Sequence, residues 1–163
     1  MIDRAEIAKN KKLVQRYPFL APKEYDWDYY EETGNDRLII PDTYDYTWTW
    51  LDGMPNGWRE AFGADLCKEL WDELVKHDCL DDYIIYDVKE KYGALRIDDG
   101  GVPIGAESIW DVIEKYVSLS ERTCCNCGKP ATKITKGWIL PFCDDCISPK
   151  AAYVGIGEEI DEN

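Results

Sequence analysis

Residues 124–146 read CCNCGKPATKITKGWILPFCDDC, and this stretch holds five of the seven cysteines of the 163-residue chain. It contains two C-x2-C pairs with fifteen residues between them. A two-residue spacing lets one tight turn point two sulfur atoms at the same ion, and two such turns supply the four thiolates of a tetrahedral zinc site. We predict one structural zinc ion with four cysteine ligands, Cys124, Cys127, Cys143 and Cys146.

Alternatives stay open at this centre. Cys125 can replace Cys124 in a C-x-C arrangement with Cys127, although the spacing of Cys124 reproduces that of the second pair. The cysteines can also pair as disulfides, although disulfides are uncommon in a cytosolic chain. A third alternative is that the four cysteines hold iron in place of zinc. Four thiolates leave no coordination position for water, whereas a catalytic zinc keeps one, so the predicted zinc is structural.

The predicted metal module spans residues 123–150. Between the cysteine pairs, residues 132–135 and 138–140 lie on either side of a Lys-Gly turn and favour a short hairpin. This hairpin would bring the two cysteine turns together, as in a zinc ribbon or treble clef. No flexible linker precedes the module, so we expect it to dock on the helix predicted before it. Residues 151–163 are predicted to be an acidic tail.

The preceding residues, 1–122, have the patterns of an acidic α+β body. Asp3 is a typical N-cap, and apolar residues four positions apart from Trp58 to Leu74 indicate a long amphipathic helix. Alternating apolar residues on both sides of a Tyr-Gly turn indicate a β-hairpin. The fold class is therefore α+β, a small antiparallel sheet with two or three helices. The predicted elements are a helix at 3–16, an acidic-aromatic segment at 24–52, a helix at 57–77, a hairpin at 83–98 and a helix at 105–121.

The segment 24–52 holds nine acidic residues, one arginine and eight tyrosines or tryptophans. Aromatic residues at every second position from Tyr44 to Trp50 predict a strand with an aromatic face, and Leu38–Ile40 is its expected partner. The carboxylates either form a solvated face or present a negative field to a basic groove on another protein. The candidate partner-binding carboxylates, here and around the hairpin, are Asp26, Asp28, Glu31, Glu32, Asp81, Asp82, Asp98 and Asp99.

The formal net charge of −14 is unevenly distributed along the chain. Residues 1–23 carry +4, residues 24–123 carry −16 and residues 124–163 carry −2. Such acidity is repelled by nucleic-acid phosphates and by anionic lipid, so we expect neither a direct nucleic-acid partner nor a membrane. The chain has no signal-peptide core and no run of about 18 apolar residues. We therefore expect a cytoplasmic protein.

Catalytic motifs are weak. No glycine-rich phosphate loop is followed by its lysine, and the one histidine, His77, has no serine or cysteine visibly placed beside it. Asp and Glu are too numerous for an acid–base pair to stand out. We expect no enzymatic activity and no small-molecule substrate. A pocket in which a carboxylate meets His77 would indicate an enzyme instead.

Residues 88–96 read VKEKYGALR. With the following helix, the C-x2-C-G turn, Gly137-Trp138 and the closing C-x2-C, this run resembles a group of small proteins from phages and prophages. Those proteins carry a similar Lys-Glu-Lys-Phe/Tyr-Gly-Gly-Leu-Arg hairpin before a C-terminal pair of zinc knuckles. They often have a Gly-Trp near the start of the first long helix, as at Gly57-Trp58. The resemblance covers about residues 57–146.

The resemblance implies a zinc-containing fold and an origin in a mobile element. Ala94 stands where the second glycine is usual, and residues 24–52 have no counterpart. With the small size and the acidity, the resemblance implies an anti-CRISPR, a counter-defence protein in the cytoplasm of the host bacterium. It would hold acidic surface against a basic region of a nuclease such as a Cas9-type effector and block DNA loading or cleavage.

A second function is also open, a zinc-ribbon module that binds nucleic acid or belongs to the transcription apparatus. Ribbon domains often use basic surfaces with an exposed aromatic residue for this purpose. The module has such residues around Trp138, namely Lys129, Lys133, Lys136 and Lys150. The large acidic body opposes this function.

Overall fold

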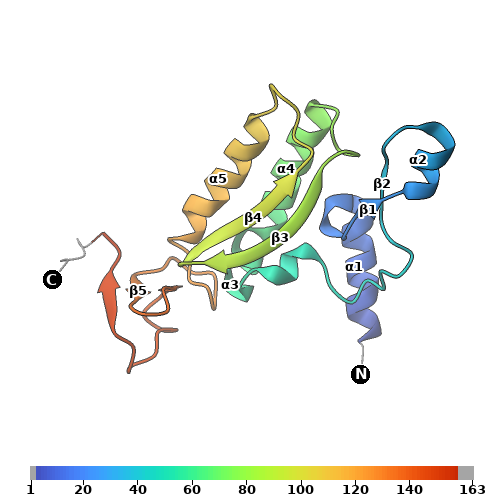
Figure 1. Ribbon diagram of the computed structural model, residues 1–163. Helices are drawn as coiled ribbons and strands as arrows, with labels where there is room; N and C mark the ends of the chain where they lie inside the picture. Colours follow the sequence, from blue (N-terminus) through green and yellow to red (C-terminus); the bar gives the residue numbers. More distant parts are fainter. Residues whose placement is uncertain (1–2, 158–163) are drawn as a thin grey trace.

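The computed structural model describes residues 3–157 and has the predicted α+β fold. At its centre, β3 (Ile84–Lys91) and β4 (Ala94–Gly100) form an antiparallel hairpin. Helices α4 (Ala64–Lys76) and α5 (Ser108–Ser120) lie side by side along one face of it (Figure 1). The hairpin and the last helix are where the sequence predicts them, at 83–98 and 105–121, with small shifts at their ends. No helix in this part of the chain is long and apolar enough to span a membrane.

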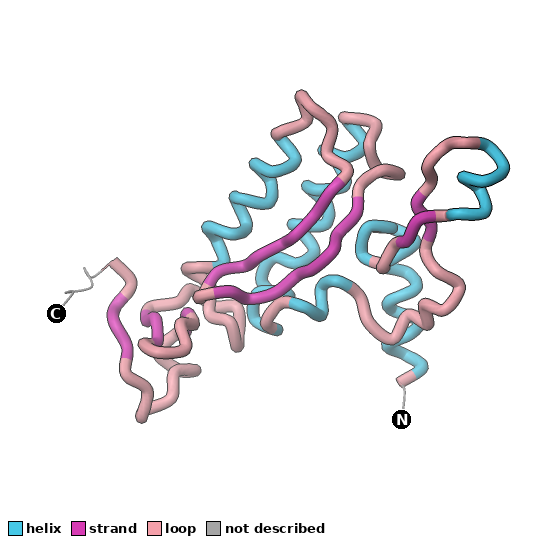
Figure 2. The backbone as a smooth tube through the Cα atoms, in the orientation of Figure 1, coloured by secondary structure: helices cyan, strands magenta, loops and turns pink. Residues whose placement is uncertain are grey.

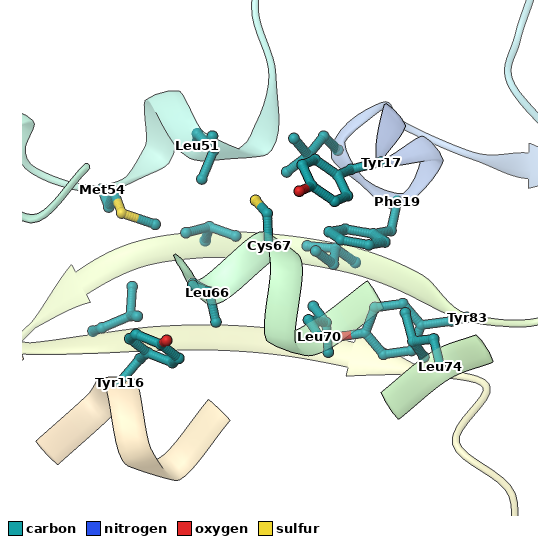
Figure 3. Packing of buried hydrophobic residues seen from close by; sticks show 14 of the residues in the cluster. Tyr17, Phe19, Leu51, Met54, Leu66, Cys67, Leu70, Leu74, Tyr83 and Tyr116 are labelled. Atoms are coloured by element: carbon teal, nitrogen blue, oxygen red, sulfur yellow. The ribbon is translucent and has the colours of Figure 1, made fainter. Parts of the chain in front are cut away.

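The core lies between the hairpin, the long helices and two 3-10 turns, Pro18–Leu20 and Trp50–Gly53. Burial of each large apolar side chain contributes about 1.5–3 kcal/mol to folding. Cys67 is buried in this core. Figure 3 labels core side chains from these elements, Tyr17, Phe19, Leu51, Met54, Leu66, Leu70, Leu74, Tyr83 and Tyr116.

The helix predicted at 57–77 contains a π-helical turn. It begins as α3 (Asn56–Trp58), widens over Arg59–Gly63 and continues as α4. Apolar residues four positions apart drift by about 40° per step around a regular α-helix. One π turn absorbs an extra residue and cancels most of this drift. All five side chains of the stripe are therefore buried, with exposures of 3% or less at Trp58, Phe62, Leu66, Leu70 and Leu74.

The first helix, α1 (Arg4–Arg16), agrees with the predicted range 3–16. Asp3 caps it, because its carboxylate accepts a hydrogen bond from the Ala5 N–H at 2.9 Å. The helix ends at Tyr17, the residue before Pro18, whose ring disfavours helical geometry there.

The prediction of a strand over residues 44–50 is wrong. Asp45 Oδ1 accepts hydrogen bonds from the Thr47 N–H (3.0 Å) and hydroxyl (2.7 Å), and Tyr46 has a φ of 62°. This side-chain-stabilised turn bends the chain. The buried Asn10 side chain of α1 donates to the Tyr46 carbonyl at 2.9 Å and holds the loop in place. The aromatic rings form a compact cluster instead of one face of a strand, with neighbouring centroids 4.5–5.8 Å apart in Tyr44, Tyr46, Trp48 and Trp50.

Residues 24–39, which we call the finger, form a small unit of their own. Strands β1 (Glu24–Tyr25) and β2 (Leu38–Ile39) pair antiparallel, so β2 has a different partner from the predicted one. Between them lies α2 (Trp27–Thr33), a helix that the sequence analysis did not predict. Figure 1 shows α2 projecting from the rest of the molecule, and none of its residues is buried.

The C-terminal module consists mainly of loops and turns, as Figure 2 shows. Its three short strands pair in the order β6–β5–β7, with β5 at Lys133–Thr135, β6 at Pro141–Phe142 and β7 at Tyr153–Gly155. The predicted hairpin is present, but its second strand begins after 138–140. Strand β7 belongs to the predicted tail, 151–163, whose residues 158–163 lie outside the described part of the chain.

Candidate metal centre

The sulfur atoms of the four predicted ligands lie within 4.8 Å of one another, in two turns that face each other. Four sulfurs at about 2.3 Å from a tetrahedral zinc are about 3.8 Å apart. The Cys127 and Cys143 sulfurs are 3.6 Å apart, close to this spacing and far beyond the length of a disulfide bond, about 2.05 Å. All seven cysteines are free thiols. The donor set therefore fits a structural metal ion such as zinc.

Cys124 and not Cys125 belongs to the cluster. The Cys125 side chain lies in the hydrophobic core, where burial raises the pKa of its thiol to about 11. Its backbone joins three segments, because its N–H donates to the Pro141 carbonyl (3.0 Å) and its carbonyl accepts from the Gly57 N–H (2.9 Å). Consecutive residues therefore point to opposite sides of the turn.

Backbone N–H groups in the two turns favour the thiolate form of Cys124. Burial opposes ionisation of Cys124, but the N–H groups of Cys127, Cys143 and Asn126 point at its sulfur and lower its pKa to about 6. The Asn126 side chain donates to the Cys146 sulfur at 3.3 Å. Such outer hydrogen bonds orient metal ligands.

The module joins the body at the start of the helix 56–76. Besides the Gly57–Cys125 hydrogen bond, the indole N–H of the fully buried Trp58 donates to the Thr123 carbonyl at 2.9 Å. A Cβ on Gly57 would lie 2.2 Å from the Cys124 carbonyl oxygen, so only glycine allows this close approach. The sequence did not indicate this joint, although the Gly-Trp pair is part of the resemblance.

His77 has a serine beside it, contrary to the sequence expectation. Its Nε2 lies 2.8 Å from Ser108 Oγ and 3.5 Å from a Glu73 carboxylate oxygen, beside an open hollow of about 390 Å³ between α4 and α5. The Ser108 hydroxyl donates to Glu73 at 2.7 Å and lowers the pKa of that carboxyl. In a hydrolase triad the carboxylate and the serine meet different ring nitrogens. Here Nε2 faces both, and the group joins the end of α4 to the start of α5.

The eight candidate partner-binding carboxylates fall into two sets. Three already have partners within the fold. Asp26 is ion-paired with Arg37, Asp98 with Arg96, and the half-buried Asp99 accepts a hydrogen bond from the Tyr83 hydroxyl at 2.8 Å. The other five are exposed and, within residues 3–157, have no cation within ion-pair distance, namely Asp28, Glu31 and Glu32 on α2, and Asp81 and Asp82 before β3.

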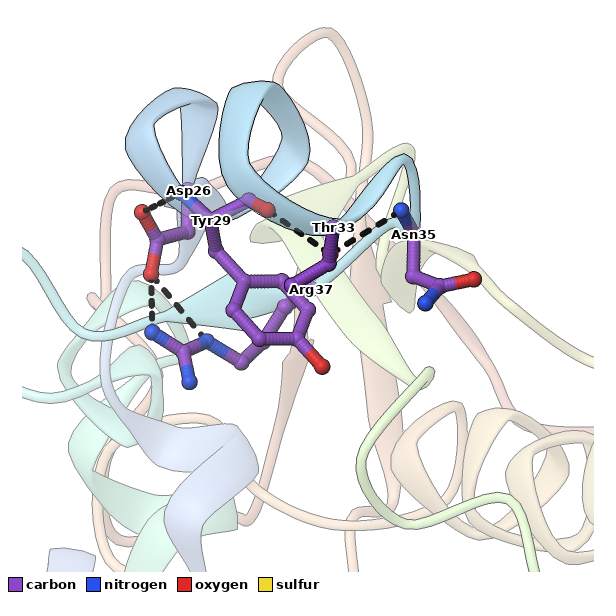
Figure 4. A network of polar contacts seen from close by, with 5 residues as sticks. All are labelled: Asp26, Tyr29, Thr33, Asn35 and Arg37. Atoms are coloured by element: carbon purple, nitrogen blue, oxygen red, sulfur yellow. Dashed lines mark hydrogen bonds and ion pairs between the residues drawn. The ribbon is translucent and has the colours of Figure 1, made fainter.

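Figure 4 shows how the finger is braced. Asp26 caps α2 through the Tyr29 N–H (3.1 Å), and its carboxylate accepts from the Arg37 guanidinium. That guanidinium also lies 4.1 Å from the centre of the Tyr29 ring. The Thr33 hydroxyl donates to the Tyr29 carbonyl and accepts from the Asn35 N–H. The network braces α2, none of whose residues is buried.

The braced finger displays three aromatic rings that the sequence analysis did not single out. Tyr25, Trp27 and Tyr30 are 49%, 67% and 45% exposed. Trp27 stacks on Tyr25 and meets Tyr30 edge-on, with centroids 5.8 and 6.2 Å away. Asp26 as an N-cap, with aromatic residues three apart after it, was the available signal for this helix.

A comparison with models of known protein families, with curated proteins and with solved structures finds no match for this chain. The four-cysteine centre and the finger are therefore described from the structure of this chain alone. The first fits a structural metal ion, and the second is an exposed surface of defined chemistry.

Proposed function

We propose that this protein is a non-enzymatic inhibitor that uses its finger to occupy a Lys- and Arg-rich, nucleic-acid-binding surface of another protein. The observation that carries the proposal is the set of side chains exposed on the finger. Three exposed rings, of which Trp27 contacts both others, stand next to three carboxylates, Asp28, Glu31 and Glu32, that have no cationic partner in the described chain.

This display has the chemistry of a nucleic-acid strand. Carboxylates form charge-assisted hydrogen bonds with arginine and lysine, as phosphates do, and aromatic faces attract guanidinium groups, as bases do. A basic groove that holds nucleic acid would therefore accept the finger in its place. Because the Asp26–Arg37 pair and the Thr33 hydroxyl already order α2, little conformational entropy is lost on binding.

The metal centre would contribute to this function by stabilising the fold and not by contact with the partner. Figure 1 shows the finger and the C-terminal module at opposite ends of the molecule. Zinc held by four thiolates supplies folding energy and keeps no open position for a substrate. The zinc would therefore hold the fold that carries the finger and would not touch the partner.

The resemblance to small phage and prophage proteins supports a particular class of partner. Such a protein acts in the cytoplasm of an infected bacterium, where defence nucleases present basic channels to guide and target strands. We propose a Cas9-type effector as the partner. The finger would lie in a basic channel and block DNA loading or cleavage.

The test is binding to a purified Cas9-type effector. The affinity of the wild-type protein should fall as salt rises, and the complex should not cleave DNA. Trp27→Ala and the triple variant Asp28→Asn/Glu31→Gln/Glu32→Gln should each weaken binding at least about tenfold, as expected at an interface hot spot. Unchanged melting temperature and zinc content would show that the variants are folded.

The matched control neutralises three exposed carboxylates away from the finger, in Glu60→Gln/Asp65→Asn/Glu121→Gln. It changes the net charge by the same amount and should bind within about twofold of wild type. An equal loss in both triple variants would show that overall charge, and not the finger, drives binding. No binding to any of a panel of defence nucleases would contradict the proposal.

A further inference from the structure

A groove lies where the tip of the β3–β4 hairpin meets the turn between β5 and β6. In Figure 1 the closed end of the hairpin reaches the C-terminal module. The tips touch, because a Cβ on Gly93 would lie 3.0 Å from Ile139 Cγ2. Beside this contact is a hollow of about 290 Å³, lined by Glu90, Lys91, Tyr92, Gly137, Trp138 and Ile139.

Two aromatic rings project at this groove, one from each tip. Tyr92 is 78% exposed and Trp138 is 77% exposed. Tyr92 also has a φ of 52°, followed by Gly93 at 80°, in a tight turn whose first position favours Asn, Asp or Gly. A tyrosine there strains the backbone, and its ring gains little packing in return. The side chain is therefore suited to a contact outside the fold.

Each ring has an unpaired lysine close to it in sequence. Seven of the nine Lys and Arg residues between positions 24 and 122, such as Lys68, Lys89 and Arg96, are paired with carboxylates. Lys91 and Lys136 have no carboxylate within 4 Å in the described chain, and Lys91 Nζ lies 5.8 Å from the Tyr92 ring centre.

The one carboxylate in the lining is already engaged. Glu90 Oε1 accepts a hydrogen bond from the Gly93 N–H at 2.7 Å and so closes the hairpin turn. A second hollow, of about 440 Å³, lies between β4 and α5, and its lining includes Tyr92, Lys91, Arg96 and Glu114. Tyr92 and Lys91 thus line both hollows.

We propose that this groove binds single-stranded nucleic acid, with bases stacked on Tyr92 and Trp138 and phosphates on Lys91 and Lys136. Rings that stack bases beside cations that track the backbone are the recurring means of binding single strands. Bases in a duplex are already stacked and offer no face to these rings, and the acidic body repels the dense charge of a duplex. The site is distinct from the finger, which lies at the other end of the molecule.

The test uses the full chain and fluorescently labelled strands of about twelve nucleotides, RNA and DNA, in anisotropy titrations at low salt. Single strands should bind and a duplex of the same length should not. Tyr92→Ala and Trp138→Ala should each weaken binding at least about fivefold. Two phosphate contacts predict a slope near about −1.4 in log affinity against log salt, and Lys91→Glu/Lys136→Glu should bring this slope close to zero.

Two controls match these changes. Trp27→Ala removes an exposed ring from the finger, and Lys68→Glu/Lys76→Glu makes the same change of net charge on α4. Both should bind the strands like wild type. Because Trp27→Ala is also expected to weaken effector binding at least about tenfold, failure of this site and failure of the proposed function are distinguishable.

Three results would overturn the proposal. One is no binding of single strands to the wild-type protein. Another is an equal loss in the control variants. The third is that Tyr92→Ala and Trp138→Ala weaken only binding to an effector protein or self-association of the chain, since the groove would then be a protein interface.

Discussion

At the residue scale, adjacent cysteines have different roles. Cys124 should be a metal ligand, whereas Cys125 packs in the core. We expect Cys124→Ser to lose the zinc and much of the stability of the module, because structural zinc supplies folding energy. Cys125→Ala should keep one zinc per chain and lose only packing, about 1 kcal/mol. Elemental analysis and thermal unfolding measure both. Loss of zinc in Cys125→Ala, with zinc retained in Cys124→Ser, would contradict this ligand set.

Gly57 is the residue that allows the module to dock. Gly57→Ala places a methyl group against the Cys124 carbonyl and should destabilise the protein by about 1–3 kcal/mol. Gly63→Ala is the control, since a Cβ there has its nearest neighbours at an ordinary 3.6 Å. In a helix interior that change should stabilise by about 0.5–1 kcal/mol. Denaturant unfolding compares them, and equal free energies of unfolding would contradict the close approach.

Asp99 should make the stability depend on pH. Burial raises the pKa of its carboxyl, although the Tyr83 and Trp110 side chains donate hydrogen bonds that lower it. Its contribution to stability is therefore complete below the pKa of the unfolded chain, about 3.9, and is lost as pH rises through the higher folded value. Asp99→Asn should melt higher than wild type at pH 7, and the difference should vanish near pH 3. A difference that grew on acidification would contradict this sign.

At the scale of elements, the π turn keeps the apolar stripe on one face. Deleting Glu60 should restore a regular helix and rotate Trp58 by about 100° relative to Leu66, Leu70 and Leu74. We expect loss of cooperative unfolding, because the buried indole leaves its place at the joint. Glu60→Ala, which keeps the residue count, should change the stability by less than about 0.5 kcal/mol. Circular dichroism during heating distinguishes them, and a deletion variant as stable as wild type would contradict the role of the π turn.

The features that the sequence predicts correctly are those that depend on residues close together in the sequence. Cysteine spacing and the apolar period from Trp58 to Leu74 are local signals, and both agree with the structure. The 44–50 strand failed because the hydrogen bonds from Thr47 to Asp45 outweigh an aromatic alternation. The finger and the groove depend on contacts between distant positions, such as Asp26 with Arg37 or Gly93 with Ile139, which one sequence does not reveal.

At the scale of the whole molecule, the positions of the acidic residues matter more than their total charge. Of the eight candidate carboxylates, three are used within the fold and three of the free ones lie on the finger. The groove, which Lys91 lines, lies at the opposite end, between the tip of the β3–β4 hairpin and the C-terminal module. The molecule therefore offers an anionic aromatic surface at one end and a cationic aromatic one at the other.

Replacing residues 24–39 by two glycines tests the central claim most directly. Glu24 and Ile39 are paired across neighbouring strands, about 5 Å apart, so we expect two glycines to join the flanking residues Lys23 and Ile40. We expect an unchanged melting temperature and zinc content, with at least about a hundredfold weaker binding to the effector. A finger-less protein that binds and inhibits the effector like wild type would contradict this claim.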